Sequence, residues 1–206
     1  MPRTNVYIDG FNLYYGAVKG TPYRWLNLAA LCRQMLPNDA IQSIKYFTAI
    51  VSARPHDPQQ PMRQQVYLRA LRTLPEVSLI YGHFLTHSVP MMLTGSNPPQ
   101  RVWVDKTEEK GSDVNLATHL LHDGFKGLFD TAVLITNNSD LMEPVKIIRR
   151  ELNLPVGILN PHQRHSCTLK PQATFMKRIR QSDVAACQFP QTMVDAHGYF
   201  HKPPSW

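Results

Sequence analysis

Along this chain, segments with the pattern of buried strands alternate with segments of helical periodicity. The run NVYID at 5–9 and the run QSIKYFTAIV at 42–51 have the apolar and aromatic residues of buried strands, the second on both of its faces. Between such runs, apolar residues recur three or four positions apart, as Leu141, Val145 and Ile148 do, which is the period of a helix. This alternation predicts an α/β fold with a mostly parallel, Rossmann-like sheet and helices on both faces.

The same patterns assign elements to the rest of the chain. Residues 86–100 are irregular around the turn cluster at 95–99, so we expect an insertion or flap there. We expect one domain over residues 1–186 and an extended C-terminal arm or hairpin over residues 187–206. Further strands are expected at 77–85, 101–105, 132–136 and 154–159, and helices at 27–36, 60–74 and 171–186, with another that starts at 112 or 113.

Composition excludes several classes of protein. Hydrophobic residues make up 43% of the 206 positions, which is enough for a sizeable core. No run of about 18 apolar residues predicts a membrane span, and no charged stretch followed by an apolar one predicts a secretory signal. The three cysteines are widely spaced and odd in number, which argues against a disulfide framework and a structural zinc site. We therefore expect a folded, cytoplasmic protein with reduced cysteines.

The formal net charge of +7 is unevenly distributed along the chain. No acidic residue occurs between Glu151 and Asp183, whereas five basic residues do. This basic stretch is either a solvated helix face with a loop or a track for the phosphate backbone of a nucleic acid. Its members are Arg164, Lys170, Lys177, Arg178 and Arg180.

Three aspartates are placed so that they can meet at one edge of the sheet. Asp9 ends the first strand, Asp113 stands at the start of a predicted helix, and Asp140 lies just past the strand AVLIT. In parallel α/β sheets, ligands bind beyond the carboxyl ends of the strands. Asp113 and Asp140 could each be an ordinary helix N-cap, but Asp9 has no capping role among the predicted elements. Asp9 is therefore the strongest candidate for a functional carboxylate.

Carboxylates that converge repel one another unless a cation or protons neutralise them. Oxygen ligands favour a hard divalent ion, so the expected ion is Mg²⁺ or Mn²⁺. Such an ion can activate a water and stabilise the charge that develops on a phosphate. The expected catalytic residues and metal ligands are Asp9, Asp113 and Asp140, with Asn138 as a neutral ligand, Asn12 as a further oxygen nearby and Glu109 as another candidate carboxylate.

Three motifs together resemble the NYN branch of the PIN-like nucleases, in its bacterial form. They are IDGFNLYYG, EEKGSDVNLATHLL and VLITNNSDL, in this order, and the similarity extends over most of the chain. The resemblance implies a PIN-like parallel α/β fold and divalent-metal-dependent cleavage of RNA phosphodiester bonds by an acidic cluster. It places Asp9, Asp113 and Asp140 at the family's acidic positions and Asn12 at the asparagine of its first motif.

One position departs from the family's pattern. The last motif of the family usually reads Ser/Asn-Asp-Ser/Gly-Asp, whereas this chain has NNSD at 137–140, with Asn138 at the place of the first aspartate. Asparagine keeps one acceptor oxygen but removes a negative charge, so we expect weaker metal binding and weaker activation of water. Two explanations are open: a site that is naturally impaired or specialised, or one deliberately inactivated by an Asp→Asn change.

Other residues are candidate substrate contacts, and each also has an ordinary structural explanation. Lys110 could contact a phosphate or be a solvated loop lysine, and Arg54 follows the second strand at its carboxyl end. Ser139 could bind a phosphate or orient Asp140, although serine is common in turns. The expected substrate contacts are thus Asn12, Ser139, Lys110 and Arg54, with Tyr14 or Tyr15 as a platform for an RNA base. An H-x2-H-x-C cluster, His162, His165 and Cys167, lacks the full ligand set of a zinc site.

The leading hypothesis is a cytoplasmic ribonuclease that uses Mg²⁺ or Mn²⁺ and acts on RNA, with single-stranded RNA expected. A catalytically weak RNA-binding or regulatory module in the same cleft is the first alternative, and Asn138 supports it. A phosphohydrolase of small phosphate compounds, which would not need the basic stretch, is the second. A homodimer or a regulatory partner stays open. No Walker loop, G-x-S-x-G elbow or G-x-G-x-x-G fingerprint is present, which disfavours nucleotide-driven motors, serine hydrolysis and dinucleotide redox chemistry.

Overall fold

The computed structural model describes residues 1–206 and has a six-stranded sheet at its centre. All neighbouring strands of this sheet run parallel, in the order β3-β2-β1-β6-β7-β8. The α/β class predicted from the alternation of elements is confirmed. The strands are β1 (Arg3–Asp9), β2 (Ala40–Thr48), β3 (Val77–Tyr81), β6 (Thr131–Ile135), β7 (Val156–Asn160) and β8 (Phe175–Arg178).

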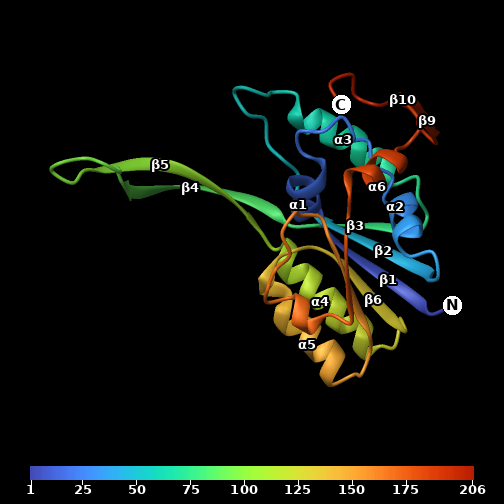
Figure 1. The fold of residues 1–206 in the computed structure, drawn as a ribbon. Helices are drawn as coiled ribbons and strands as arrows, with labels where there is room; N and C mark the ends of the chain where they lie inside the picture. Colours follow the sequence, from blue (N-terminus) through green and yellow to red (C-terminus); the bar gives the residue numbers. More distant parts are fainter.

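Helices cover both faces of this sheet (Figure 1). One face packs against α4 (Ser112–Phe125) and α5 (Met142–Arg150). The other face packs against α1 (Gly10–Leu13), the π-helical turn η1 (Tyr14–Val18), α2 (Leu28–Met35), α3 (Gln60–Leu71) and α6 (Gln181–Ala186). Two short 3-10 turns complete the secondary structure, η2 (Ser139–Leu141) and η3 (Lys170–Gln172). None of the helices is both long enough and apolar enough to cross a membrane.

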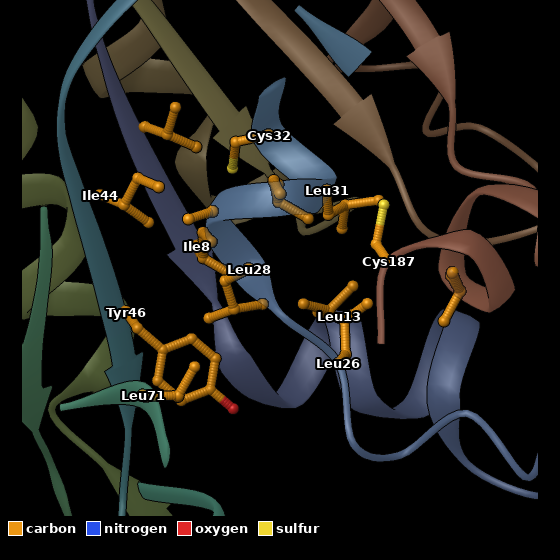
Figure 2. Packing of buried hydrophobic residues seen from close by; sticks show 14 of the residues in the cluster. Ile8, Leu13, Leu26, Leu28, Leu31, Cys32, Ile44, Tyr46, Leu71 and Cys187 are labelled. Atoms are coloured by element: carbon orange, nitrogen blue, oxygen red, sulfur yellow. The ribbon is translucent and has the colours of Figure 1, made fainter. Parts of the chain in front are cut away.

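The first strand shows why the sheet needs a layer of helices on each side. Val6 and Ile8 belong to one buried apolar cluster, and Tyr7 between them belongs to the other, because successive side chains of a strand point to opposite faces. All three side chains are fully buried. Figure 2 shows the first cluster, in which Leu28 and Leu31 of α2 pack with Ile8. A strand that is apolar on both faces is thus stable only inside a three-layer fold.

The spatial order of the strands reverses at β1. Strands β2 and β3 lie on one side of β1, and β6, β7 and β8 lie on the other. Chain segments that leave the carboxyl ends of β1 and β6 therefore diverge, and in α/β sheets the crevice between them is where ligands bind. Asp9 is the last residue of β1 and lies at this point.

An antiparallel ribbon, β4 (His83–Met92) and β5 (Arg101–Lys110), projects far from the sheet (Figure 1). The sequence predicted a single strand over 77–85, a flap over 86–100 and a short strand at 101–105. The structure corrects this, because both ribbon strands are ten residues long. Their side chains are mostly exposed on both faces, so no hydrophobic alternation marks them in the sequence.

Gly82 separates the end of β3 from the ribbon, where the sequence predicted a continuous strand. A Cβ added at Gly82 would lie 2.4 Å from Oε1 of Glu109 and 2.5 Å from the carbonyl oxygen of Lys110. Only a glycine therefore allows β4 to leave the sheet so close to the end of β5.

The predicted helix over 171–186 is wrong in its first half. Residues 175–178 form β8 beside β7, and α6 begins only at Gln181. The ring of Phe175 lies directly over Gly157 of β7, where an added Cβ would meet it at 2.1 Å. The packing of this aromatic side chain on the neighbouring strand decides the local structure, which periodicity alone did not show.

The segment after Phe189 forms a hairpin, β9 (Thr192–Asp195) and β10 (Gly198–His201), and it packs on the body of the protein. The buried ring of Trp25 lies 5.6 Å from Phe189, 6.4 Å from Phe200 and 6.3 Å from Trp206, measured between ring centroids. The C-terminal residues thus complete the apolar cluster beside α3. The predicted domain boundary at 186 stays a prediction.

Candidate active site

Asp9 lies at the crevice between β1 and β6, and its side chain is only 6% exposed. One carboxylate oxygen accepts the backbone N–H of Asn12 at 2.9 Å, and the other accepts the hydroxyl of Thr136 at 3.1 Å. Asp9 is therefore the N-cap of α1. The expectation that Asp9 has no capping role is wrong, because the four-residue helix that it caps is too short to show a period in the sequence.

The cap does not neutralise this carboxylate. Burial, foremost, raises the pKa of Asp9 to about 6, and the negative charges of Asp113 and Glu109 add to the shift, whereas the hydrogen bonds from Asn12 and Thr136 oppose it. No basic side chain forms an ion pair with Asp9. A buried carboxylate without a counter-charge costs stability, and such groups are more frequent at functional sites than elsewhere.

Gly10, which follows Asp9, brings the first helix close to the second strand. A Cβ added at Gly10 would lie 2.6 Å from the carbonyl oxygen of Phe47 and 2.7 Å from the ring of Tyr46. Larger residues are thus excluded, and the backbone turns sharply beside the carboxylate.

Asn12 connects three loops at the edge of the sheet. Its side-chain oxygen accepts the backbone N–H of Asn137 at 2.8 Å and lies 3.1 Å from Nε2 of His162. Because two groups already share this oxygen, Asn12 holds the loops after β6 and β7 in place. His162 also lines the cavity described below, and the sequence offered no signal for it beyond the incomplete H-x2-H-x-C cluster.

Asp113 stands in the first turn of α4, and the residue at the N-cap is Gly111, with a φ of 95°. The helix thus begins at Ser112, within the expected range, but Asp113 is not its N-cap. Oδ2 of Asp113 accepts a hydrogen bond from the side-chain amide of Asn138 at 3.0 Å. Burial is the largest cause of the raised pKa of Asp113, followed by repulsion from Glu109 and Asp140.

Asn138 is the N-cap of η2, because its side-chain oxygen accepts the backbone N–H of Asp140 at 3.1 Å. Both ends of its amide are therefore used, the oxygen by Asp140 and the nitrogen by Asp113. An aspartate at this position would keep the cap but could not donate to Asp113 at neutral pH. The amide of Asn138 thus fixes the carboxylate of Asp113 without adding a negative charge to the site.

Glu109 is the third carboxylate at this place. It accepts hydrogen bonds from the backbone N–H and the hydroxyl of Ser112, at 3.0 and 2.7 Å. The base of the ribbon therefore forms one wall of the site, and Phe84 from β4 packs edge-on against Phe11 of α1 with 5.7 Å between ring centroids.

These side chains open into one cavity of about 550 Å³, called the main cavity here. It brings together most of the predicted site residues: Asp9, Asn12, Tyr14, Tyr15, Arg54, Glu109, Asp113 and Asn138. Three predicted residues do not line it. Ser139 and Asp140 are exposed beyond its rim, and Lys110 forms an ion pair with Glu108 at 3.1 Å.

No three His, Cys, Asp or Glu side chains lie close enough together to hold a metal ion. Asp9, Glu109, Asp113 and the amide of Asn138 nevertheless all contribute oxygens to the lining of the main cavity, and oxygen is the donor type that a hard divalent ion prefers. Metal binding stays a prediction, and it requires these carboxylates to move closer to one another.

The NYN domain profile matches residues 3–177. The chain belongs to the NYN domain family. The predicted family is confirmed, and the parallel α/β sheet agrees with it. A relative in this comparison is the 6-hydroxy-3-succinoylpyridine 3-monooxygenase HspA of Pseudomonas putida, which is 32% identical over 235 aligned positions, covering 99% of this chain and 75% of the relative.

A solved structure shares the fold of this NYN chain. It is a protein of unknown function from Vibrio parahaemolyticus, with a TM-score of 0.56 and 18% sequence identity, and the match covers 87% of this chain and 93% of that one. At this level of identity the similarity supports the architecture and says nothing of activity.

Proposed function

We propose that this NYN protein is a divalent-metal-dependent ribonuclease that hydrolyses RNA phosphodiester bonds at the carboxyl edge of its sheet. The observation that carries the proposal is the pair Asp9 and Asp113, two carboxylates in one cavity with no basic partner. Burial is the largest cause of the raised pKa of each, and nearby negative charges add to it: Asp113 and Glu109 for Asp9, and Glu109 and Asp140 for Asp113. Membership in the NYN family supports it. Mutual repulsion in a partly buried site favours the uptake of a cation.

Asp9, Asp113 and Asp140, with Asn138, are the proposed ligands of Mg²⁺ or Mn²⁺, and Glu109 is a further oxygen beside them. When bound, the ion would supply an activated water and stabilise the charge that develops on the phosphate. Asp9 is oriented in advance by Asn12 and Thr136, and Asp113 by Asn138. Asp140 is exposed and makes no ion pair, but it is near enough to raise the pKa of Asp113.

The proposed path for the RNA backbone is the basic stretch between Glu151 and Asp183. Most of its basic side chains are exposed. Lys170 and Arg178, together with His165, line a smaller hollow of about 170 Å³ beside Asn160 at the end of β7. A hollow with several cations suits a phosphate group, and such contacts make binding weaken as salt increases.

Cleavage of labelled single-stranded RNA in the presence of Mn²⁺ tests this function. Asp140→Ala is expected to abolish cleavage, and Asn138→Asp to accelerate it, because the change restores a negative charge beside Asp113. Glu151→Gln is a matched control, since Glu151 is exposed and forms no ion pair. The ribonuclease proposal fails if neither the parent protein nor Asn138→Asp cleaves any RNA or DNA. Binding of RNA by the parent protein that weakens steeply with salt would then indicate the RNA-binding or regulatory module instead.

One observation favours a second candidate function, oxidation of a small aromatic compound. The relative named as a monooxygenase matches nearly the whole of this chain, and the volume of the main cavity is in the range typical of small-molecule sites. The substrate in that name combines a pyridine ring with an acidic side chain, and the main cavity has aromatic walls. Oxygen consumption that requires both 6-hydroxy-3-succinoylpyridine and a two-electron reductant would support this candidate, and its absence with either reduced nicotinamide or reduced flavin would reject it.

A further inference from the structure

The main cavity has two ends of opposite charge. The carboxylates of Asp9 and Asp113 lie at one end, and neither has its pKa shifted by any basic residue. Arginines lie at the other end, gathered around a single carboxylate, that of Asp57. The cavity-lining residues of this end are Arg24, Arg54, Asp57 and Arg63.

Asp57 holds the arginine end together. Arg63, in the first turns of α3, donates to its carboxylate and forms an ion pair with it. The backbone of Asp57 pairs with that of Arg54 through an N–H to carbonyl bond of 2.9 Å. The hydrogen bond from Arg63, foremost, lowers the pKa of Asp57, and the charge of Arg24 contributes. The charges of Arg63 and Arg24 thus act on Asp57, and Arg54 adds a third positive charge to the same lining, so positive charges exceed negative ones here.

Two of these arginines lack any acceptor. Arg24 and Arg54 make no ion pair and no side-chain hydrogen bond, whereas Arg63 is already engaged by Asp57. Nε of Arg24 is buried and has no hydrogen-bond partner. A buried donor without an acceptor destabilises the folded protein. The other N–H groups of Arg24 and those of Arg54 are not buried in this way and also have no acceptor, so they are free to donate to an anion in the main cavity.

Aromatic side chains line the same cavity and provide apolar walls around the charged ends. Tyr14 and Tyr15 come from η1, Tyr67 from α3, and Trp206 from the C-terminus. Tyr67 is fixed by a hydrogen bond from its hydroxyl to the carbonyl oxygen of Leu26 at 2.8 Å, and its ring lies 5.8 Å from that of Trp206. Such walls accept the flat face of a planar ring.

We propose that Arg24 and Arg54 form an anion subsite that holds the phosphate or carboxylate of a ligand with an aromatic ring, the ring lying between the aromatic side chains. Guanidinium groups bind both anions through paired N–H donors. This proposal rests on the proposed function, because it takes the ligand of the arginine end to be the substrate that reacts at the carboxylate end of the same cavity. A nucleotide of an RNA strand and a small aromatic carboxylate share this chemistry.

Matched pairs of compounds test the subsite by calorimetry on the full chain, in EDTA so that no divalent ion contributes. The pairs are uridine monophosphate with uridine, and phenylbutyrate with phenylbutanol, and in each pair only the first compound carries an anion. We expect one of the anionic compounds to bind about tenfold more tightly than its neutral partner, as one additional charge-assisted interaction would give. A difference in the uridine pair would identify the ligand as a nucleotide, and a difference in the phenylbutyrate pair would identify it as an aromatic carboxylate.

Variants of the two arginines test whether the preference for the anionic compound arises at Arg24 and Arg54. Arg24→Gln and Arg54→Gln should each remove most of the difference within the pair, and Arg54 is exposed, so its replacement leaves the fold intact. Arg101→Gln is the matched control, because Arg101 lies at the far end of the ribbon without an ion pair. Equal binding of anionic and neutral compounds, absence of binding by all four, or equal losses in Arg24→Gln, Arg54→Gln and Arg101→Gln would each overturn the subsite.

These outcomes are distinct from failure of the ribonuclease. If RNA is cleaved with Mn²⁺ but neither arginine variant affects ligand binding, the subsite is wrong and the ribonuclease stands. If an anionic ligand depends on Arg24 and Arg54 but no RNA is cleaved, the subsite stands and the ribonuclease is wrong.

Discussion

Asp9 and Asp123 are the two buried carboxylate residues of this protein, 6% and 1% exposed. Asp123, on α4, accepts hydrogen bonds from Nζ of Lys45 at 2.5 Å and from the hydroxyl of Tyr7 at 2.7 Å. Burial by itself would raise the pKa of Asp123, but the bonds from Lys45 and Tyr7 bring it below the usual range. Asp9 accepts only uncharged donors, and its pKa is raised to about 6.

The difference separates a carboxylate that stabilises the fold from one that is available for chemistry. Asp123 has a cation within the protein, and the ion pair with Lys45 joins α4 to β2. Asp9 lies at the edge of the sheet with two further carboxylates and without a cation. Burial alone therefore does not mark a functional group, whereas burial without a counter-charge does.

Replacement of Asp123 should have the largest effect on stability. Asp123→Ala leaves the ammonium of Lys45 without its anion and Tyr7 without its acceptor, so we expect the free energy of unfolding to fall by about 3 kcal/mol. Denaturant unfolding at pH 7 measures this. Activity per folded molecule should be unchanged, and a loss of cleavage greater than the loss of folded protein would contradict the structural role.

Replacement of Asp9 should raise the stability of the metal-free protein, whereas replacement of Asp123 lowers it. Asp9→Asn keeps an acceptor for the N–H of Asn12 and removes the buried charge, so we expect unfolding at pH 7 to require up to about 3 kcal/mol more free energy, corresponding to a pKa shift of about two units. RNA cleavage should be abolished. Addition of Mn²⁺ should raise the melting temperature of the parent protein and not that of the variant. A variant that is less stable than the parent would show that the carboxylate of Asp9 stabilises the fold.

The two carboxylates should also differ in how stability depends on pH in metal-free protein. The pKa of Asp9 is about 6 in the folded protein and about 4 when unfolded, so the folded state binds more protons between these values and its stability falls as pH rises from about 4 to 6. Asp123 has a lowered pKa, so its stabilising contribution is complete above about pH 4 and is lost as pH falls further. Melting temperatures in EDTA across this range, compared with Asp9→Asn, measure the first effect. If the parent and the variant show the same slope between pH 4 and 6, Asp9 does not titrate as described.

Asn138→Asp should have the smallest effect on stability, and its response to Mn²⁺ tests whether position 138 binds the metal. It replaces the hydrogen bond to Asp113 by repulsion, so metal-free protein should lose about 1 kcal/mol of unfolding free energy. Mn²⁺ should then raise the melting temperature more than it does in the parent, because a further charged ligand is present. Asn153→Asp is the control, since Asn153 is exposed and lies outside the main cavity. An equal response of both variants to Mn²⁺ would contradict a metal ligand at position 138.

Much of the site was predictable because its residues lie at the ends of strands. Asp9 follows a clear buried strand, and the loop after β6 carries Asn138, so the topology of a parallel sheet brings them together. Asp140 does not line the main cavity with them, because its side chain is exposed on η2 while its backbone N–H donates to the side chain of Asn138. Arg24 could not be found, because nothing in its local sequence shows that it lies beside Asp57, which is 33 positions later in the chain.

The fold was predictable to the extent that elements have a buried face. The strands β1, β2, β6 and β7 and the helices α2 and α5 carry such a face and agree with the expected positions. The long ribbon and β8 were missed for different reasons. The ribbon is exposed on both sides, so it carries no periodic signal, and β8 depends on the packing of Phe175 over Gly157, two residues of different strands.

The parallel α/β class, the family and the position of Asp9 at a strand end could all be predicted from the sequence. Local periodicity is sufficient for the fold class and for the strand that ends at Asp9, because it records which faces of an element are buried. The family follows instead from the resemblance carried by the residues of its motifs. Other features became visible only in the folded chain: Asp9 caps α1, Asn138 donates to Asp113, Glu109 but not Asp140 lines the main cavity, and arginines from two distant loops and α3 line it as well. These features depend on contacts between segments far apart in the chain, and their charges acquire shifted pKa values only when the fold removes water from around them.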